Sequence, residues 1–227
     1  MTCCSPTDEW RFSPVRKCAV VFGATSPVGR AVVRAALAEG YELTAVVPAA
    51  KGMGYADARV TVVEGDVLDS TGVTAAIVED AAVFVALERA SGSPHVLETA
   101  VRHIAAGCRA RGVKRIVVLG IGGARLPTDA EPSLAVSVAR WVRGATGAHD
   151  GDDVIRAVDW LRASKLEWTL VRVAALHDGA SSDGKYTMGD AQLGMEAVSR
   201  EDVAHAMVSC VENHLFVRQT PVVVPAS

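Results

Sequence analysis

The chain has few aromatic residues and no cysteine pair in a metal-binding spacing. Aromatic side chains make up 5% of the 227 residues, and the five cysteines include no C-x-x-C motif. This cysteine pattern argues against a disulfide framework or a zinc site, so we expect a cytoplasmic protein without bound metal. No apolar run approaches the about 18 residues of a membrane-spanning helix. The net charge of −3 lacks the basic surplus that binds nucleic acid or an anionic membrane.

The first 16 residues also lack the features of a targeting segment. They contain Asp8 and Glu9 and no apolar stretch, so we expect a flexible polar leader and not a signal peptide. N-myristoylation requires a glycine after the initiator, and Thr2 stands in that place. Cys3 and Cys4 could accept palmitate, or they could simply belong to the polar leader.

Several common catalytic signatures are missing as well. The sequence has no G-x-S-x-G nucleophile elbow, no Walker A lysine and no H-x-x-x-H pair of metal ligands. These absences argue against serine hydrolase, P-loop and zinc-dependent chemistry. What the sequence does contain is 50% hydrophobic residues, with many Val and Ala. That composition is typical of buried parallel strands packed between helices.

The most informative segment covers residues 18–40, where an apolar run is followed by a turn and then by helix-forming residues. The turn, which we call the glycine corner (residues 23–29), begins at Gly23 and ends at Gly29, with Pro27 suited to the first turn of a helix. Ser26 stands in the place of the middle glycine of a G-x-x-G-x-x-G pattern. A strand, glycine turn and helix in this order form a phosphate-binding corner, and the Ser26 hydroxyl could donate to a phosphate. The alternative is a strand-to-helix turn without that function.

Strand and helix patterns alternate about seven times along the chain, which predicts an α/β fold. We expect residues 17–227 to form a single domain: a Rossmann-like, doubly wound parallel sheet with helices on both faces and a small C-terminal elaboration on the substrate side. The predicted strands cover 17–22, 42–47, 60–64, 82–87, 116–119, 168–173 and 222–224. The predicted helices cover 27–39, 70–79, 93–111, 134–143, 150–163 and 199–213. The segment 174–197, which contains four glycines, is predicted to be irregular.

Three further motifs follow the glycine corner. They are Glu-Gly-Asp-Val-Leu-Asp at 64–69, Leu-Arg-Ala-Ser at 161–164 before the sixth strand, and Ser-Arg-Glu-Asp at 199–202. In this order the four motifs resemble the atypical short-chain dehydrogenase/reductase family, and within it the small NAD(P)H-binding proteins similar to NmrA and to flavin reductase (biliverdin-IX-beta reductase). The resemblance implies a dinucleotide held by Gly23, Thr25, Ser26, Pro27, Val28, Gly29, Asp66, Val67, Ala86, Leu87 and Gly120.

The residues after the second predicted strand bear on the choice of cofactor. An acidic residue there would bind the ribose hydroxyl of NAD, but residues 46–51 contain none. The arginine that the family commonly carries near Pro48 for the NADP phosphate is also absent. Arg30 and Lys51 are the basic substitutes, and they favour NADP(H) over NAD(H). Alternatively, both are ordinary surface charges.

Asp66 and Val67 follow the third predicted strand, where the resemblance implies the adenine ring. The Asp66 carboxylate could accept from the adenine amine while Val67 offers its backbone. Alternatively, Asp66 caps the turn into the next helix, as aspartate often does.

The catalytic residues of the best-known members of the family are missing. None of the three tyrosines has a lysine four positions later, where the residues are Ala45, Arg59 and Asp190. The family's serine position falls in the Gly-Ile-Gly-Gly stretch at 120–123, which has no hydroxyl. A reductase that passes hydride directly from a nicotinamide to a planar flavin or quinone needs neither group.

A histidine near the acceptor, or water, would supply the proton for such a reduction. His177, just after the sixth predicted strand, is the first candidate, followed by His149, and Glu88 points to the same rim. Each of the three also fits an ordinary surface residue. The alternative function is a non-enzymatic NAD(P) sensor similar to NmrA, which would bind a protein partner.

Overall fold

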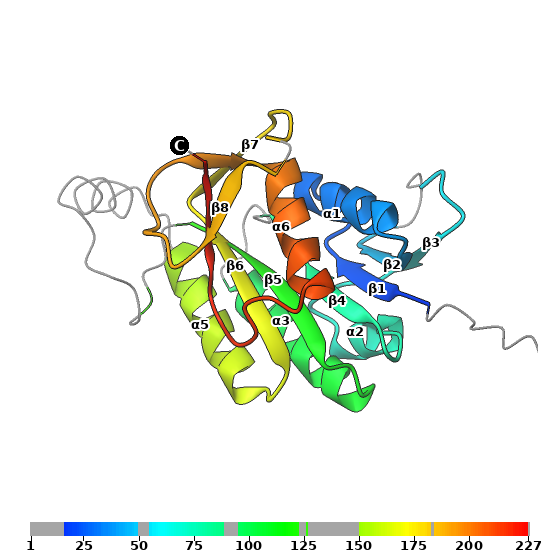
Figure 1. Ribbon diagram of the computed structural model, residues 1–227. Coiled ribbons are helices and arrows are strands. Elements are labelled where there is room, and N and C mark those ends of the chain that lie inside the picture. Colours follow the sequence, from blue (N-terminus) through cyan, green and yellow to red (C-terminus); the bar gives the residue numbers. More distant parts are fainter. Residues whose placement is uncertain are drawn as a thin grey trace, which may run out of the picture.

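The computed structural model describes residues 16–49, 55–88, 95–122, 126, 150–182 and 184–226 (Figure 1). Lys51, His149, Cys3 and Cys4 lie outside these ranges, as does the helix predicted over residues 134–143. Among the helices within them, none is both long and apolar enough to cross a membrane.

An eight-stranded sheet forms the middle layer of the molecule. Its strands are β1 (Cys18–Phe22), β2 (Glu42–Val47), β3 (Val60–Glu64), β4 (Ala82–Val85), β5 (Arg115–Ile121), β6 (Glu167–Val173), β8 (Tyr186–Gly189) and β10 (Val222–Pro225). The spatial order is β3-β2-β1-β4-β5-β6-β10-β8, and all neighbours are parallel except β10 and β8. The predicted doubly wound α/β fold is therefore confirmed. The strand order reverses between β1 and β4, and in such sheets ligands bind beside the reversal, at the carboxyl ends of the strands.

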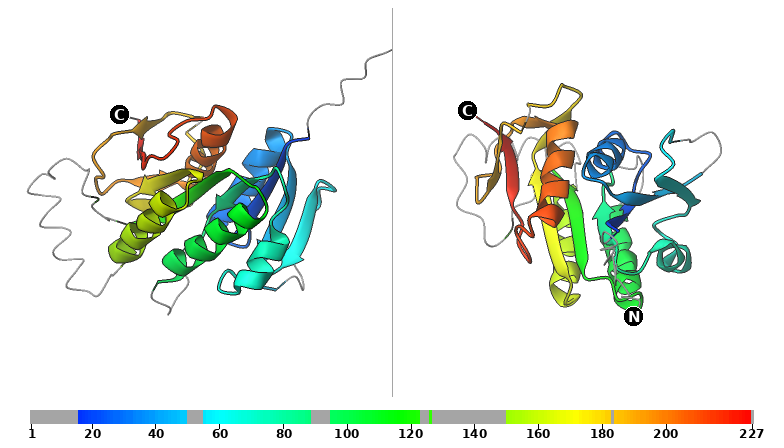
Figure 2. Two further views of the ribbon diagram at one scale, coloured as in Figure 1. Left: turned by 90° about the horizontal axis from the view of Figure 1, so that it is seen from below. Right: turned by 45° about the vertical axis from the view of Figure 1, so that its right-hand side comes forward.

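Helices cover both faces of the sheet, as predicted (Figure 2, left). On one face α1 (Pro27–Ala38) packs against α6 (Arg200–Glu212). The other face is covered by α2 (Ser70–Ala76), α3 (Val96–Ala110) and α5 (Asp150–Ala163).

Strand β1 contributes to the cores on both faces, because successive side chains of a strand point in opposite directions. Val21 joins the core beneath α1 and α6, whereas Val20 and Phe22 join the core beneath α3 and α5. All three side chains are fully buried. The strand that leads into the glycine corner is thus fixed at the centre of the fold.

The segment predicted to be irregular, 174–197, contains short strands. β7 (Ala175–His177) pairs in parallel with β9 (Ala197–Ser199) in a separate two-stranded sheet. β8 pairs antiparallel with β10 and forms one edge of the main sheet. The prediction was wrong here because strands of three or four residues are too short to show alternation, and their partners in the sheet stabilise them.

Two predicted boundaries shift in ways that matter for the site. β4 ends at Val85 and not at residue 87, so Ala86 and Leu87 lie in the loop that follows it. β5 continues to Ile121 and not to residue 119, so Gly120 lies inside a strand.

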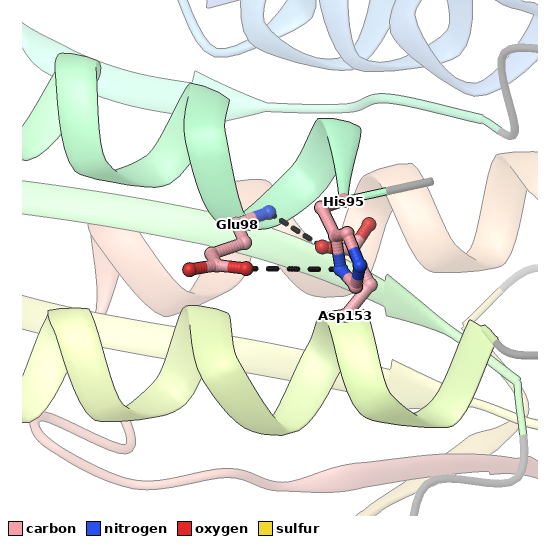
Figure 3. Close-up of side chains that lie close together, drawn as sticks. All are labelled: His95, Glu98 and Asp153. Atoms are coloured by element: carbon pink, nitrogen blue, oxygen red, sulfur yellow. Dashed lines mark hydrogen bonds and ion pairs between the residues drawn. The ribbon is translucent and has the colours of Figure 1, made fainter. Parts of the chain in front are cut away.

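The N-terminus of α3 is capped by a residue of another helix (Figure 3). Its own N-cap residue, His95, has a left-handed backbone (φ 66°) and makes no capping bond through its side chain. Asp153 of α5 instead accepts from the backbone N–H groups of Leu97 at 3.0 Å and Glu98 at 2.8 Å. Within the described ranges, His95, Glu98 and Asp153 form the one group whose ligand atoms are close enough for a metal ion. We interpret the group as a helix cap, since both Asp153 oxygens bind backbone N–H groups and Arg156 pairs with Glu98.

Candidate functional site

The glycine corner joins the carboxyl end of β1 to the first turn of α1. Gly23 has a left-handed backbone (φ 82°), and a Cβ there would lie 2.5 Å from the carbonyl oxygen of Ala86 and 2.9 Å from Leu87 Cδ2. A Cβ on Gly29 would lie 2.0 Å from the carbonyl oxygen of Gly23. Such contacts are sterically forbidden, so the turn requires glycine at both ends. The corner therefore packs tightly onto the loop after β4.

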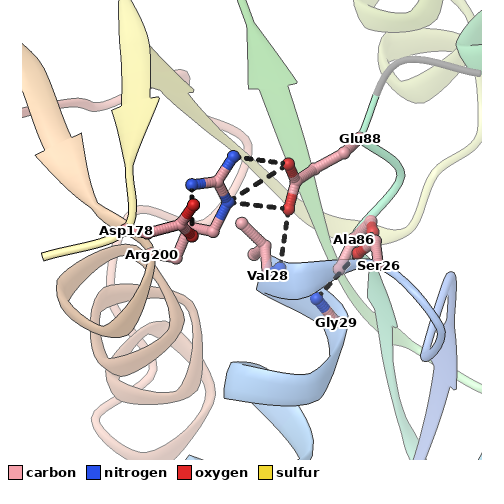
Figure 4. Close-up of polar contacts among 7 residues, drawn as sticks. All are labelled: Ser26, Val28, Gly29, Ala86, Glu88, Asp178 and Arg200. Carbon is pink, nitrogen blue, oxygen red and sulfur yellow. Dashed lines mark hydrogen bonds and ion pairs between the residues drawn. The ribbon is translucent and has the colours of Figure 1, made fainter.

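Ser26 holds the corner together through its side chain (Figure 4). Its hydroxyl accepts from the backbone N–H of Gly29 at 2.8 Å and donates to the carbonyl oxygen of Ala86 at 2.8 Å. A serine hydroxyl carries one proton that it can donate. In this arrangement the Ser26 proton is engaged by Ala86, and a hydrogen bond from Ser26 to a phosphate stays a prediction. Ser26 caps α1 and ties it to the loop after β4.

A carboxylate of the protein itself occupies the N-terminus of α1 (Figure 4). Glu88 Oε1 accepts from the backbone N–H of Val28 at 2.7 Å. The Glu88 carboxylate also accepts from Arg200, from Nε at 3.1 and 3.2 Å and from Nη2 at 3.0 Å, while Nη1 donates to Asp178 at 2.8 Å. The hydrogen bonds to Glu88 raise the pKa of the Arg200 guanidinium. The Glu88 side chain is 17% exposed, so it is a paired group and not the solvated loop charge that the sequence also allowed.

Arg200 is a residue of this network that the sequence did not point to. It follows Glu88 by 112 residues and appears in the sequence only within the Ser-Arg-Glu-Asp capping motif. This motif caps α6 at its start, where Ser199 Oγ accepts from the N–H of Asp202 at 3.1 Å. One sequence feature could have pointed to Arg200. A helix N-terminus disfavours a positive charge, so an arginine at the first position of α6 suggests a role other than stabilising the helix.

His177 lies on β7, next to this network. It pairs in register with Ser199 of β9, and the following residue, Asp178, is a partner of Arg200. Its imidazole lies over Gly179, where an added Cβ would be 2.5 Å from His177 Cε1. The side chain is exposed to solvent. His177, the candidate proton donor, is therefore next in sequence to Asp178, which binds Arg200, and Arg200 binds the Glu88 carboxylate at the N-terminus of α1.

Asp66 follows β3 and closes a turn. Its Oδ1 accepts from the N–H of Leu68 at 2.9 Å, so Asp66 closes the turn that leads to α2, while the N-cap residue of α2 is Asp69. The carbonyl oxygen of Val67 lies 3.2 Å from Nδ1 of His103 on α3. A carboxylate can accept several hydrogen bonds, so the turn leaves Asp66 able to contact an adenine. That contact stays a prediction.

Arg30 and Tyr55 contact the backbone of the glycine corner. Arg30, on the exposed side of α1, donates from Nε to the carbonyl oxygen of Thr25 at 3.3 Å. Tyr55 donates to the carbonyl oxygen of Ala24 at 2.8 Å. Burial raises the pKa of Tyr55, and the nearby Arg30 and Arg34 act in the opposite direction. The sequence around Tyr55 carries no pattern that would have marked it as part of a site.

Gly120 lies within β5, where close packing explains the glycine. It pairs with Arg172 of β6, and a Cβ would lie 2.8 Å from Leu170 Cδ2 and 3.2 Å from Val154 Cγ1. A contact between Gly120 and a cofactor stays a prediction.

Known proteins share both the sequence pattern and the fold. A sequence model described as NAD(P)H-binding matches residues 23–214. The structure of ChuY, an anaerobilin reductase from Escherichia coli O157:H7, is 24% identical with a TM-score of 0.74, covering 92% of this chain and 97% of that one. A short-chain dehydrogenase/reductase from Veillonella parvula, solved with NADP, is 18% identical with a TM-score of 0.71, covering 91% and 94%. The oxidoreductase ylbE from Lactococcus lactis is 15% identical with a TM-score of 0.73, covering 92% and 91%.

At these identities the solved structures establish the fold, while the sequence model covers most of the chain and establishes the family. The resemblance drawn from the four motifs is confirmed at that level. This chain belongs to the NAD(P)H-binding family and has the Rossmann-like fold that short-chain dehydrogenases/reductases share.

Proposed function

We propose that this protein is an NADPH-dependent reductase that binds the dinucleotide at the glycine corner and reduces a small planar acceptor. One observation carries the proposal: the N–H of Val28 already binds an anion, the Glu88 carboxylate, at 2.7 Å. A helix N-terminus favours anions, and the diphosphate is the anion that a dinucleotide would bring there. Membership of an NAD(P)H-binding family supports that ligand.

The charges beside the corner favour NADP(H) over NAD(H). Arg30 and Arg34 both lie close enough to Tyr55 to affect its pKa. Residues 46–51 contain no carboxylate for the ribose hydroxyl of NAD. Arg34 is already paired with Glu201, so a phosphate on the ribose would gain mainly from Arg30, whereas an unmodified ribose would not.

The chain itself would contribute orientation and one proton. A bound reduced nicotinamide supplies hydride, so the acceptor needs one further proton to complete its reduction. His177 is exposed and lies next to the Arg200 network, so His177 or water would supply that proton. Without a Tyr-x-x-x-Lys pair, the acceptor has to take hydride with little acid catalysis. Flavins, quinones and bilins meet that requirement, and one protein of this fold is named an anaerobilin reductase.

Pro27 provides the test of the site, because it is exposed at the first position of α1. Pro27→Asp adds a carboxylate that the helix N-terminus tolerates but that repels a phosphate. Both Pro27→Asp and the matched Pro27→Asn restore a backbone N–H at this position, so the two variants differ only in charge. We expect calorimetric titration to show NADPH binding about tenfold weaker in Pro27→Asp than in Pro27→Asn. Equal affinities in the two variants would mean that the dinucleotide binds elsewhere.

The second candidate function is a non-enzymatic NAD(P) sensor that acts on a protein partner. It is favoured by the missing Tyr-x-x-x-Lys pair and by the absence of a hydroxyl at 120–123. Turnover separates the two functions. NADPH oxidation that depends on the protein and on an added flavin, quinone or bilin supports the reductase, whereas stoichiometric binding without oxidation across the panel supports the sensor.

A further inference from the structure

The first turn of α1 has a single backbone donor left for a ligand. Of the N–H groups at positions 26–30, three are used within the corner itself, and one is missing because residue 27 is proline. The remaining donor is the N–H of Val28, and it donates to the Glu88 carboxylate. Any other anion that binds this N–H must therefore displace the Glu88 carboxylate.

Arg200 completes an anion site around the same donor. The Val28 N–H and two nitrogens of the Arg200 guanidinium converge on one carboxylate, with all distances at or below 3.2 Å. A helix N-terminal amide together with an arginine fork is a donor set that suits a phosphate group. Asp178 binds the third nitrogen, Nη1, at 2.8 Å, so Arg200 keeps its orientation toward the corner when Glu88 leaves.

We propose that Glu88 is an internal competitor of the cofactor. Its carboxylate occupies the place of a cofactor phosphate, and the dinucleotide displaces it and takes over both Val28 and Arg200. The inference rests on the proposed function, because it requires the dinucleotide to bind at the glycine corner. The Glu88 and Arg200 side chains are less than one-fifth exposed, so water screens charges poorly at this position. A phosphate and the Glu88 carboxylate would therefore repel each other strongly and cannot both bind the Val28 N–H. Glu88 therefore lowers the affinity for the cofactor, and Arg200 binds its phosphate.

Glu88→Gln tests the competition, because glutamine keeps the shape and an oxygen for Val28 but carries no charge. We expect calorimetry to show NADPH and inorganic pyrophosphate binding about tenfold more tightly to Glu88→Gln, and about tenfold more weakly to Arg200→Gln. Glu79→Gln removes the same charge from an exposed position and serves as the control, with affinity within about twofold of the wild type.

The amide proton of Val28 gives a second readout by nuclear magnetic resonance. In the cofactor-free protein its signal should move upfield in Glu88→Gln, because a neutral acceptor replaces a carboxylate. An unchanged Val28 signal, or NADPH affinity in Glu88→Gln equal to or below that of the wild type, overturns the inference. Weaker binding in Pro27→Asp without tighter binding in Glu88→Gln would reject the competition alone. No change in either variant would reject the proposed site as well.

Discussion

Gly29 is required by packing whether or not a ligand is bound. A Cβ at this position would lie 2.0 Å from the carbonyl oxygen of Gly23, so even alanine would force the backbone of the corner apart. Any substitution at Gly29 changes the shape of the corner, and a loss of binding would follow from that change. Charge at the corner is better tested at Pro27, and cofactor preference at Arg30, because both side chains are exposed.

Arg30→Gln should reduce the preference for NADP(H). The substitution removes one of the cations near Tyr55, and a ribose phosphate would lose that attraction. We expect the dissociation constant for NADPH to rise about tenfold while that for NADH stays within about twofold, measured by calorimetry on the same preparations. A parallel loss for both cofactors would instead mean that Arg30 supports the corner through its bond to Thr25.

Among the elements, the N-terminus of α6 depends on a buried carboxylate. Asp202 is 4% exposed and accepts from Ser199 Oγ at 2.7 Å, Ser181 Oγ at 2.9 Å and the N–H of Ser182 at 2.9 Å. Burial by itself raises the pKa of Asp202, but these hydrogen bonds outweigh it and lower the pKa below the ordinary value of 3.8. The network joins α6 to the segment that follows β7.

Acid should weaken this network. A carboxylate whose pKa is lower in the folded state contributes stability above its unfolded pKa, and that contribution is lost as the pH falls through the folded value. We expect the free energy of unfolding, measured by urea denaturation, to decline between about pH 5 and pH 3. Asp202→Asn should be less stable at neutral pH and should decline less steeply. Equal slopes in Asp202→Asn and the wild type would contradict this account.

The parallel strands and most helices were predictable because their signals are local. α1 begins at Pro27 and is followed by Gly40 in a left-handed conformation (φ 84°), as the proline and glycine of its sequence indicate. The capping of α3 by Asp153 was not predictable, since the capping residue belongs to a different helix. The pairing of Glu88 with Arg200 was not predictable for the same reason. The periodicity of a sequence does not indicate which charged residues far apart in the chain form an ion pair.

At the scale of the whole molecule, the candidate site combines residues from the N-terminal part and the C-terminal third of the sequence. The glycine corner comes from the first strand and helix, whereas Asp178 and Arg200 come from the C-terminal third, which packs back through α6 against α1. A ligand that binds both parts would hold them together. Its binding should therefore be visible in global stability.

NADPH should raise the melting temperature of the protein. A ligand that binds only the folded state adds about 2.7 kcal/mol at a free concentration of 100 times its dissociation constant. We expect scanning calorimetry to show a clear upward shift with NADPH, a smaller shift with NADH at equal concentration, and a much reduced shift for Pro27→Asp. A melting temperature insensitive to both dinucleotides at millimolar concentration would contradict the reductase and the sensor alike.

The carboxylate at the N-terminus of α1 also bears on which ligands the cofactor-free protein accepts. Cells contain orthophosphate and many small phosphorylated metabolites, and a bare helix N-terminus beside an arginine would bind any of them. With Glu88 bonded there, a small anion gains little beyond the carboxylate that it replaces. A dinucleotide makes additional contacts along its whole length and can offset that loss. The Glu88–Arg200 pair thereby favours long ligands over short ones and keeps the site available for the cofactor.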